Sequence, residues 1–191
     1  MKRRLFIALS ALSLGMCLVT AVTYFIRSWG NAVAEVTDPG QYQTILRDLG
    51  YPTPTKLNVP TLGHFPATIP SNATNVRFFF RPHVLQGGTQ MQLRVSVPSE
   101  QVAAVLEAVK PAAKEVQTGG DMFDALNEHG GLPSSMFRDG ANGAFAPLPK
   151  EFQVFVLDAK ASSQSGWDKG YSYGVAVNEK EGEVIYWIED W

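Results

Sequence analysis

The chain has 191 residues, a net charge of −2 and an apolar content of 45%, with 18% charged and 11% aromatic residues. This composition excludes an intrinsically disordered chain, because such chains lack the apolar and aromatic side chains that build a core. The small excess of acidic residues argues against sequence-independent nucleic-acid binding, which requires a basic surface that displaces phosphate counterions. The length fits one domain of ordinary size.

The N-terminal region carries the strongest signal in the sequence. A basic tail at residues 1–4 precedes an uncharged apolar run over residues 5–26. As a helix this run would be about 33 Å long, which is enough to cross the hydrocarbon core of a bilayer. The sequence therefore predicts a transmembrane signal-anchor helix at 5–26, a short linker at 27–37 and a single exported domain at 38–191.

The charges around the apolar run predict its orientation. Basic residues are concentrated before the run, and the positive-inside rule keeps such a segment in the cytoplasm. We therefore expect a cytoplasmic N-terminus and an extracytoplasmic location for residues 28–191. Two alternatives remain open. The first is cleavage after Ala34, which ends an A-x-A pattern and would release a secreted domain. The second is a bacterial lipoprotein, because the residues up to Cys17 resemble a lipobox imperfectly.

Cys17 is the only cysteine of the chain, and it lies inside the apolar run. The exported part therefore has no disulfide bond, cysteine nucleophile or cysteine zinc site. Without the basic residues that flank the run, it has 12 basic and 18 acidic residues and a charge of about −6. A domain with this charge is not expected to adhere by itself to an anionic lipid surface.

The spacing of apolar residues predicts the first elements of the exported part. A short amphipathic helix begins after Asp38, which caps it, and ends before Gly50. Residues 51–71 contain five prolines and are expected to form an extended strap across the domain. Alternating apolar residues over 76–81 and 90–97 predict a β-hairpin with one buried face.

Two further helices and a long irregular segment follow the hairpin. Ser99 is expected to cap a helix that covers the hairpin and stops at Pro111. A third helix is expected between Asp121 and Gly130. Residues 132–149 are expected to be irregular, and a loop of this length is either functional or mobile.

The C-terminal region is predicted to consist of strands. Apart from Gln153, residues 152–157 are apolar on both faces, which indicates a central strand. Residues 171–178 alternate between large and small side chains, and a turn at Gly182 joins them to a last strand over 184–191. We therefore predict an α+β fold in which helices pack on one face of a largely antiparallel sheet of about five strands.

Motifs for catalysis or cofactor binding do not occur in the sequence. The three histidines, His64, His83 and His129, lack the spacing of metal ligands. Neither a nucleophile elbow nor a glycine-rich phosphate motif is present. We therefore predict no catalytic residue, metal or cofactor, and structural roles for the histidines.

One face of the first predicted hairpin is the main candidate for a contact surface. If the apolar residues of this hairpin point inward, four residues point outward on one side: Arg77, Phe79, Arg81 and Arg94. Arginine binds carboxylates and phosphates, and an exposed aromatic residue among arginines is typical of a contact patch. The alternative is a solvated face whose arginines pair with acidic residues of the domain.

Trp167 is the second candidate for a partner contact. It is the member of the C-terminal aromatic cluster that we expect to be exposed, whereas core packing explains the rest of that cluster. An exposed tryptophan can bind a protein partner or a sugar.

These features favour a membrane-anchored extracytoplasmic domain without catalytic activity, acting as an interaction or accessory module. The expected partners are the membrane, through residues 5–26, and a protein at the cell surface or envelope. Two alternatives remain open: an anchored or secreted hydrolase with a site near residues 132–149, and a secreted inhibitor or immunity-type protein. A cleft that holds a histidine or carboxylate with a strongly perturbed pKa would favour the hydrolase.

Overall fold

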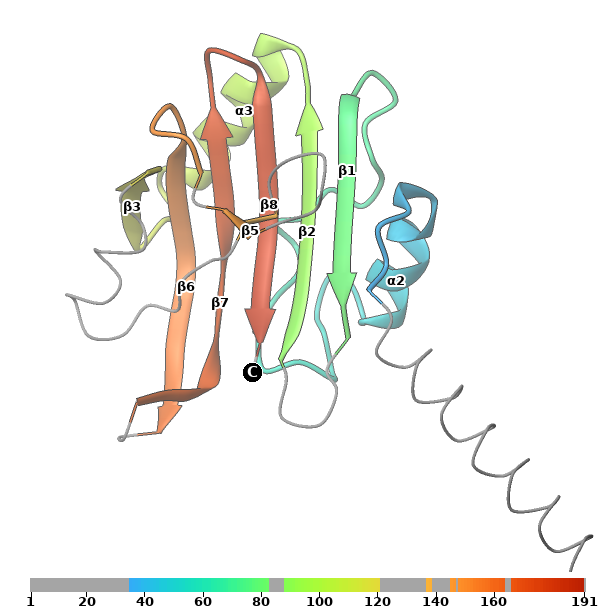
Figure 1. The fold of residues 1–191 in the computed structure, drawn as a ribbon, viewed down its shortest axis with the longest axis vertical. Helices are drawn as coiled ribbons and strands as arrows, with labels where there is room; N and C mark the ends of the chain where they lie inside the picture. The colour runs from blue at the N-terminus through green and yellow to red at the C-terminus, as the bar shows by residue number, and fades with distance from the viewer. Residues whose placement is uncertain are drawn as a thin grey trace, which may run out of the picture. The chain divides into compact units, whose positions relative to one another are not determined.

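The computed structural model describes residues 35–82, 88–120, 137–138, 145–146, 148–163 and 166–190. In these residues a six-stranded antiparallel sheet is combined with two short helices, so the fold is α+β with β-structure predominating (Figure 1). The strand order is β1-β2-β8-β7-β6-β3. The predicted membrane segment lies outside the described residues. Within them, no helix is long and apolar enough to cross a membrane.

The first helical segment begins and ends as predicted. The Asp38 carboxylate accepts a hydrogen bond of 2.9 Å from a backbone N–H of the first turn. A 3-10 turn, η1 (Pro39–Gln41), then leads into the helix α2 (Tyr42–Asp48). Gly50 has a φ of +90°, a left-handed conformation that glycine adopts without a steric penalty and that ends the helix.

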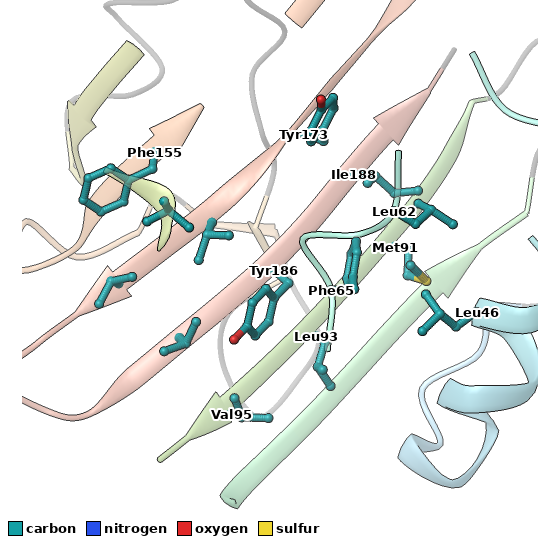
Figure 2. Close-up of a cluster of buried hydrophobic side chains, with 14 of the residues drawn as sticks. Leu46, Leu62, Phe65, Met91, Leu93, Val95, Phe155, Tyr173, Tyr186 and Ile188 are labelled. Atoms are coloured by element: carbon teal, nitrogen blue, oxygen red, sulfur yellow. The ribbon is translucent and has the colours of Figure 1, made fainter. Parts of the chain in front are cut away.

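Residues 51–71, called the strap below, contain neither a helix nor a strand, as predicted. The strap nevertheless contributes to the core, because Val59, Leu62 and Phe65 are buried. Figure 2 shows Leu62 beside Ile188 of the sheet. The prolines therefore prevent regular structure without preventing the burial of apolar side chains.

The first predicted hairpin is formed by β1 (Thr74–Arg81) and β2 (Thr89–Ser96), which pair antiparallel. β2 also pairs with β8, which leaves β1 at one edge of the sheet. Val36 covers this edge at one point, since its N–H and C=O both form hydrogen bonds of 2.8 Å with the backbone of Phe80.

The next helix, α3 (Ser99–Val109), ends before Pro111 as predicted but begins differently. Its N-cap is Pro98 in an extended conformation, and Ser99 is the first helical residue, so the predicted capping role of Ser99 is wrong. The main sheet contact of α3 is with β7 rather than with the first hairpin. The third predicted helix lies outside the described residues.

The C-terminal strands are β6 (Gln153–Ser163), β7 (Gly166–Asn178) and β8 (Glu183–Asp190). The predicted strands and the second hairpin are confirmed, but β6 and β7 are longer than predicted. The last pair between β7 and β8 is Tyr171 with Asp190. Residues 166–170 of β7 therefore pair only with β6, and this extension, called the β6–β7 arm below, reaches past the end of β8 (Figure 1).

The sheet has six strands rather than the five predicted. The additional strand is β3 (Glu115–Thr118), which pairs with β6 at the second edge. Its four residues include one apolar side chain, Val116, and are too few to give a strand pattern. In the segment predicted to be irregular, β4 (Phe137–Arg138) and β5 (Phe145–Ala146) form a separate two-stranded sheet.

The two faces of the six-stranded sheet bury two separate clusters. On the strap face, α2, α3 and the strap pack on buried residues from five strands. Figure 2 labels three of these residues, Leu93, Tyr186 and Phe155. The described helices thus cover one face of the sheet, as predicted. The opposite face, called the far face below, has its own cluster, made of Leu148, Phe152, Val154, Val156, Ala176, Ile185 and Trp187.

Candidate functional site

The arginine patch predicted on the first hairpin is not formed as expected. Phe79 is 3% exposed, so its predicted role as an exposed aromatic residue is wrong. It lies in one row of the far face with Gln92 and Trp187, which are also buried. The alternation of β1 separates two faces, but here both faces are buried, and alternation then no longer identifies the solvent side.

Arg94 belongs to an internal ion pair between β2 and β8. Its guanidinium donates hydrogen bonds of 2.8 to 3.1 Å to both carboxylate oxygens of Glu183. The two side chains are only 13% and 19% exposed, and the guanidinium lies 5.7 Å from the centroid of the Phe152 ring. A bidentate pair of this kind, beside an aromatic ring, joins two strands. The Arg94 guanidinium is therefore bound within the domain.

The other predicted contact residues occupy different parts of the sheet. Arg77 is exposed on β1 and stands opposite Arg94 in the register, whereas Arg81 is half-buried at the end of β1. Trp167 lies in the β6–β7 arm, and β2 and β8 separate its strand from β1. The structure therefore brings Arg77 and Arg94 together and leaves Trp167 in a separate region.

His64 fixes the strap over β8. Its Nε2 atom lies 3.1 Å from the backbone oxygen of Trp187, and since a carbonyl only accepts, Nε2 carries the proton and donates. The imidazole also packs against the rings of Phe65 and Tyr173, with centroid distances of 4.5 and 5.0 Å. Burial lowers the pKa of His64 to about 4, so the ring is neutral at physiological pH.

Asp158 is the centre of a second polar contact, at a bulge in β6. It accepts hydrogen bonds from Lys114 Nζ at 2.5 Å, from the Tyr171 hydroxyl at 3.0 Å and from the Ala159 N–H at 3.0 Å. Burial alone would raise the pKa of Asp158, but the hydrogen bonds from Lys114 and Tyr171 outweigh burial and lower it. Burial and the bond to Asp158 raise the pKa of Tyr171 to about 12. The carboxylate thus ties β6 to β7 and to the chain before β3.

Asp190, at the end of β8, holds the strap by a third contact. Its carboxylate accepts hydrogen bonds from the backbone N–H of Asn58 at 3.2 Å and from Asn58 Nδ2 at 2.7 Å. The two residues are 132 positions apart in the chain. Sequence reasoning missed this contact and the contacts of Asp158, because no local pattern indicates which distant polar residues will meet.

An open hollow of about 330 Å³ lies beside the turn between β7 and β8. It is lined by the buried residues Leu106, Val177 and Asn178 and by the polar residues Glu151, Gln153, Glu179 and Lys180. None of the residues predicted to contact a partner lines this hollow. Among the described residues, no group of histidine, cysteine and carboxylate side chains could hold a metal ion.

No family model, curated protein or solved structure matches this chain in sequence or structure comparisons. Its function must therefore be inferred from the chemistry and placement of its own residues. The segment where a hydrolase site was expected, 132–149, lies largely outside the described residues.

Proposed function

We propose that this chain is a single-pass membrane protein whose residues 28–191 form an extracytoplasmic, non-catalytic interaction domain. The observation that carries the non-catalytic part is that the deeply placed charged groups have internal partners. Arg94 is bound to Glu183, and Asp158 accepts from three donors. A general acid or base must instead reach a substrate with a free position for proton transfer.

His64 supports the same interpretation. Its donor nitrogen is bound to a backbone carbonyl, and its ring is enclosed by two aromatic side chains. With a pKa of about 4, the His64 imidazole is a weak base. A histidine that acts as a general base works best when its pKa is near the operating pH. We therefore assign His64 to the attachment of the strap.

The membrane part of the proposal is supported by the N-terminal sequence. An uncharged apolar run of this length spans a bilayer as a helix, and the basic tail before it favours a cytoplasmic N-terminus. Cleavage after Ala34, which would release a secreted domain, is the competing outcome.

Arg77, Arg81 and Trp167 are the proposed partner contacts that remain, and Arg77 is the more exposed of the two arginines. Arg77 is exposed on β1, near one edge of the sheet, and Trp167 lies in the β6–β7 arm. Arg77 thus lies on an edge strand of the sheet, and the backbone of Trp167 lies beyond the last pair between β7 and β8. Phe79 and Arg94 are assigned to internal packing and are no longer proposed as contacts.

Cysteine labelling tests the membrane topology of the full-length chain. In a Cys17→Ser background, Glu179→Cys places a thiol on an exposed turn, and Lys2→Cys places one in the basic tail. With a membrane-impermeant maleimide, we expect intact cells or spheroplasts to label the first variant only, and permeabilised cells to label both. Labelling of Lys2→Cys alone before permeabilisation would reverse the proposed orientation, and an intact mass beginning at Glu35 would replace the anchor with a cleaved signal.

Cross-linking in cells tests the interaction part of the proposal. We expect the wild-type chain to form a discrete cross-linked species with a partner, and Arg77→Glu or Trp167→Ala to reduce its amount. Arg47→Glu is the matched control, since Arg47 is an exposed arginine on α2. Equal yields in all four proteins would overturn the assignment of these two contacts.

A further inference from the structure

The two edges of the six-stranded sheet are protected differently. At the β1 edge, Val36 pairs with Phe80, and a bulge interrupts the register between Thr74 and Arg77. Added chain, bulges and charges are the usual protections of an edge strand. At the other edge, β3 pairs with β6 only, and no described residue pairs with its outer side.

Val116, in the middle of β3, is 56% exposed. Among the residues that the structure describes, no other large apolar side chain is exposed. Its row of the sheet continues through Phe155 into the buried core, so the apolar surface of the strap face extends outward to the open edge. A strand added beside β3 would cover Val116.

The backbone groups of Val116 point toward the open edge. The N–H of Gly119 donates to Phe152 at 2.8 Å, and the two residues continue the β3–β6 register. Successive strand residues direct their N–H and C=O groups to opposite sides of the strand. Those of Gln117 therefore face β6, and those of Val116 and Thr118 face outward, where they can pair with another strand.

We propose that the β3 edge binds the β3 edge of a second copy of this chain. The two strands would run antiparallel about a two-fold axis at Val116, with the N–H and C=O of each Val116 bonded to those of the other. This arrangement is isologous, because the same strand serves on both sides. It joins two six-stranded sheets into one and places the two exposed valines together.

The side chains of β3 are compatible with this register. Glu115 of one copy stands opposite Gln117 of the other, so a carboxylate meets an amide donor on each side of the axis. Within one copy, Gln117 Nε2 already donates to Glu115 at 2.6 Å, while Gln117 Oε1 is buried without a hydrogen-bond partner. A register centred on Glu115 is disfavoured, because two carboxylates would stand directly opposite.

The paired surface is small compared with a standard protein interface of about 1,600 Å². We therefore expect reversible pairing that is favoured when both copies are held in one membrane, which rests on the membrane attachment proposed above. The occupancy of the edge and the membrane attachment can be measured separately, because the cell fraction is recorded independently of the contact between copies.

Disulfide cross-linking of the full-length chain in native membranes tests the proposal. All variants carry Cys17→Ser, and the test variant is Val116→Cys. Directly opposed residues in a hydrogen-bonded antiparallel pair have Cα atoms about 5.5 Å apart, which a disulfide can bridge. Glu107→Cys, on the exposed side of α3, is the control for random collision. We expect about tenfold more oxidised dimer for Val116→Cys than for Glu107→Cys, as geometry limits disulfide formation.

The register has its own test. Mixed expression of Glu115→Cys and Gln117→Cys chains should give a mixed dimer in higher yield than Glu115→Cys alone. Adding Val116→Lys to both chains should abolish that dimer, because two ammonium groups would meet at the axis.

Equal cross-linking at positions 116 and 107 would overturn self-pairing. A yield of the mixed Glu115→Cys and Gln117→Cys dimer that Val116→Lys does not change would also overturn it. A cross-link between Val116→Cys and a different protein would show that the edge binds a partner strand instead. If the chain fractionates as a soluble protein but still gives the Val116→Cys dimer, the membrane proposal fails and the pairing stands.

Discussion

The imidazole of His64 donates a hydrogen bond of 3.1 Å to the backbone oxygen of Trp187, 123 residues further along the chain. This bond holds an irregular strap against the central strand β8. It also encloses a titratable group among aromatic rings, where a positive charge is poorly solvated. Attachment of the strap is therefore coupled to the protonation of one histidine.

The stability of the protein should decrease as the pH falls from about 6.5 to 4. The pKa of His64 is about 4 in the folded protein and near 6.5 in the unfolded chain, so the unfolded state binds more protons between these values. Between pH 7.5 and 5 the free energy of unfolding should drop by about 2 kcal/mol. Urea unfolding of the full-length protein in mild detergent, followed by tryptophan fluorescence, measures it.

The control for this pH dependence is His64→Gln, which retains a side-chain donor without titrating in this range. In the variant, most of the difference in unfolding free energy between pH 7.5 and 5 should disappear. The loss of stability that the substitution causes at pH 7.5 should be smaller than that difference. His83 and His129 are present in both proteins and cancel in the comparison. An unchanged difference in the variant would assign the pH dependence to other groups.

Arg94→Ala should destabilise the protein by about 2 to 3 kcal/mol, because it leaves the carboxylate of Glu183 partly buried without its partner. Arg47→Ala is the matched control. Arg47 pairs with Asp48 at 3.5 Å, but their side chains are 75% and 65% exposed, and the loss should be below about 0.5 kcal/mol. Chemical denaturation compares the two. Similar losses would mean that the internal pair contributes no more than a surface pair.

Asn58→Ala should loosen the strap at its contact with β8. Removal of the amide takes away the 2.7 Å hydrogen bond to Asp190, and we expect a loss of about 1 to 2 kcal/mol. Hydrogen exchange measured by mass spectrometry should be faster in strap peptides than in the wild type, with β7 peptides unchanged. Asn72→Ala, at an exposed asparagine outside the strap, should leave exchange unaltered. Unchanged strap exchange in Asn58→Ala would contradict a holding role for this bond.

Gly174→Ala should be strongly destabilising, because the added Cβ would lie 2.2 Å from the backbone oxygen of Phe155 and 3.0 Å from the Trp187 ring. The backbone of β6 or β7 must shift to admit it, at an expected cost of about 3 kcal/mol. Gly40→Ala is the comparison, since its Cβ would meet an exposed carboxylate at 3.2 Å, and the cost should stay below about 1 kcal/mol. Equal melting temperatures for the two variants would refute the close packing described at β7.

Local sequence patterns predicted the elements that short-range chemistry controls. Asp38 and Gly50 mark the ends of the first helical segment, because a side-chain cap and a left-handed glycine act within one turn. The two hairpins follow from alternation over adjacent segments. β3 was missed because a four-residue strand with one apolar side chain has no period of its own and is specified by pairing with β6.

The sequence by itself determined the apolar N-terminal run, the ends of the first helical segment, the strap without regular structure and the hairpin pairs, since each depends on residues close together in the chain. Only the tertiary structure decided that Phe79 is buried, that Arg94 is bound to Glu183 and that Val116 is exposed on a strand with no second partner among the described residues. The physical reason is that alternation assigns side chains to two faces of a strand without saying what covers each face. Strand order and cover come from contacts between residues far apart in the chain, and those contacts determined which predicted surface residues stayed exposed.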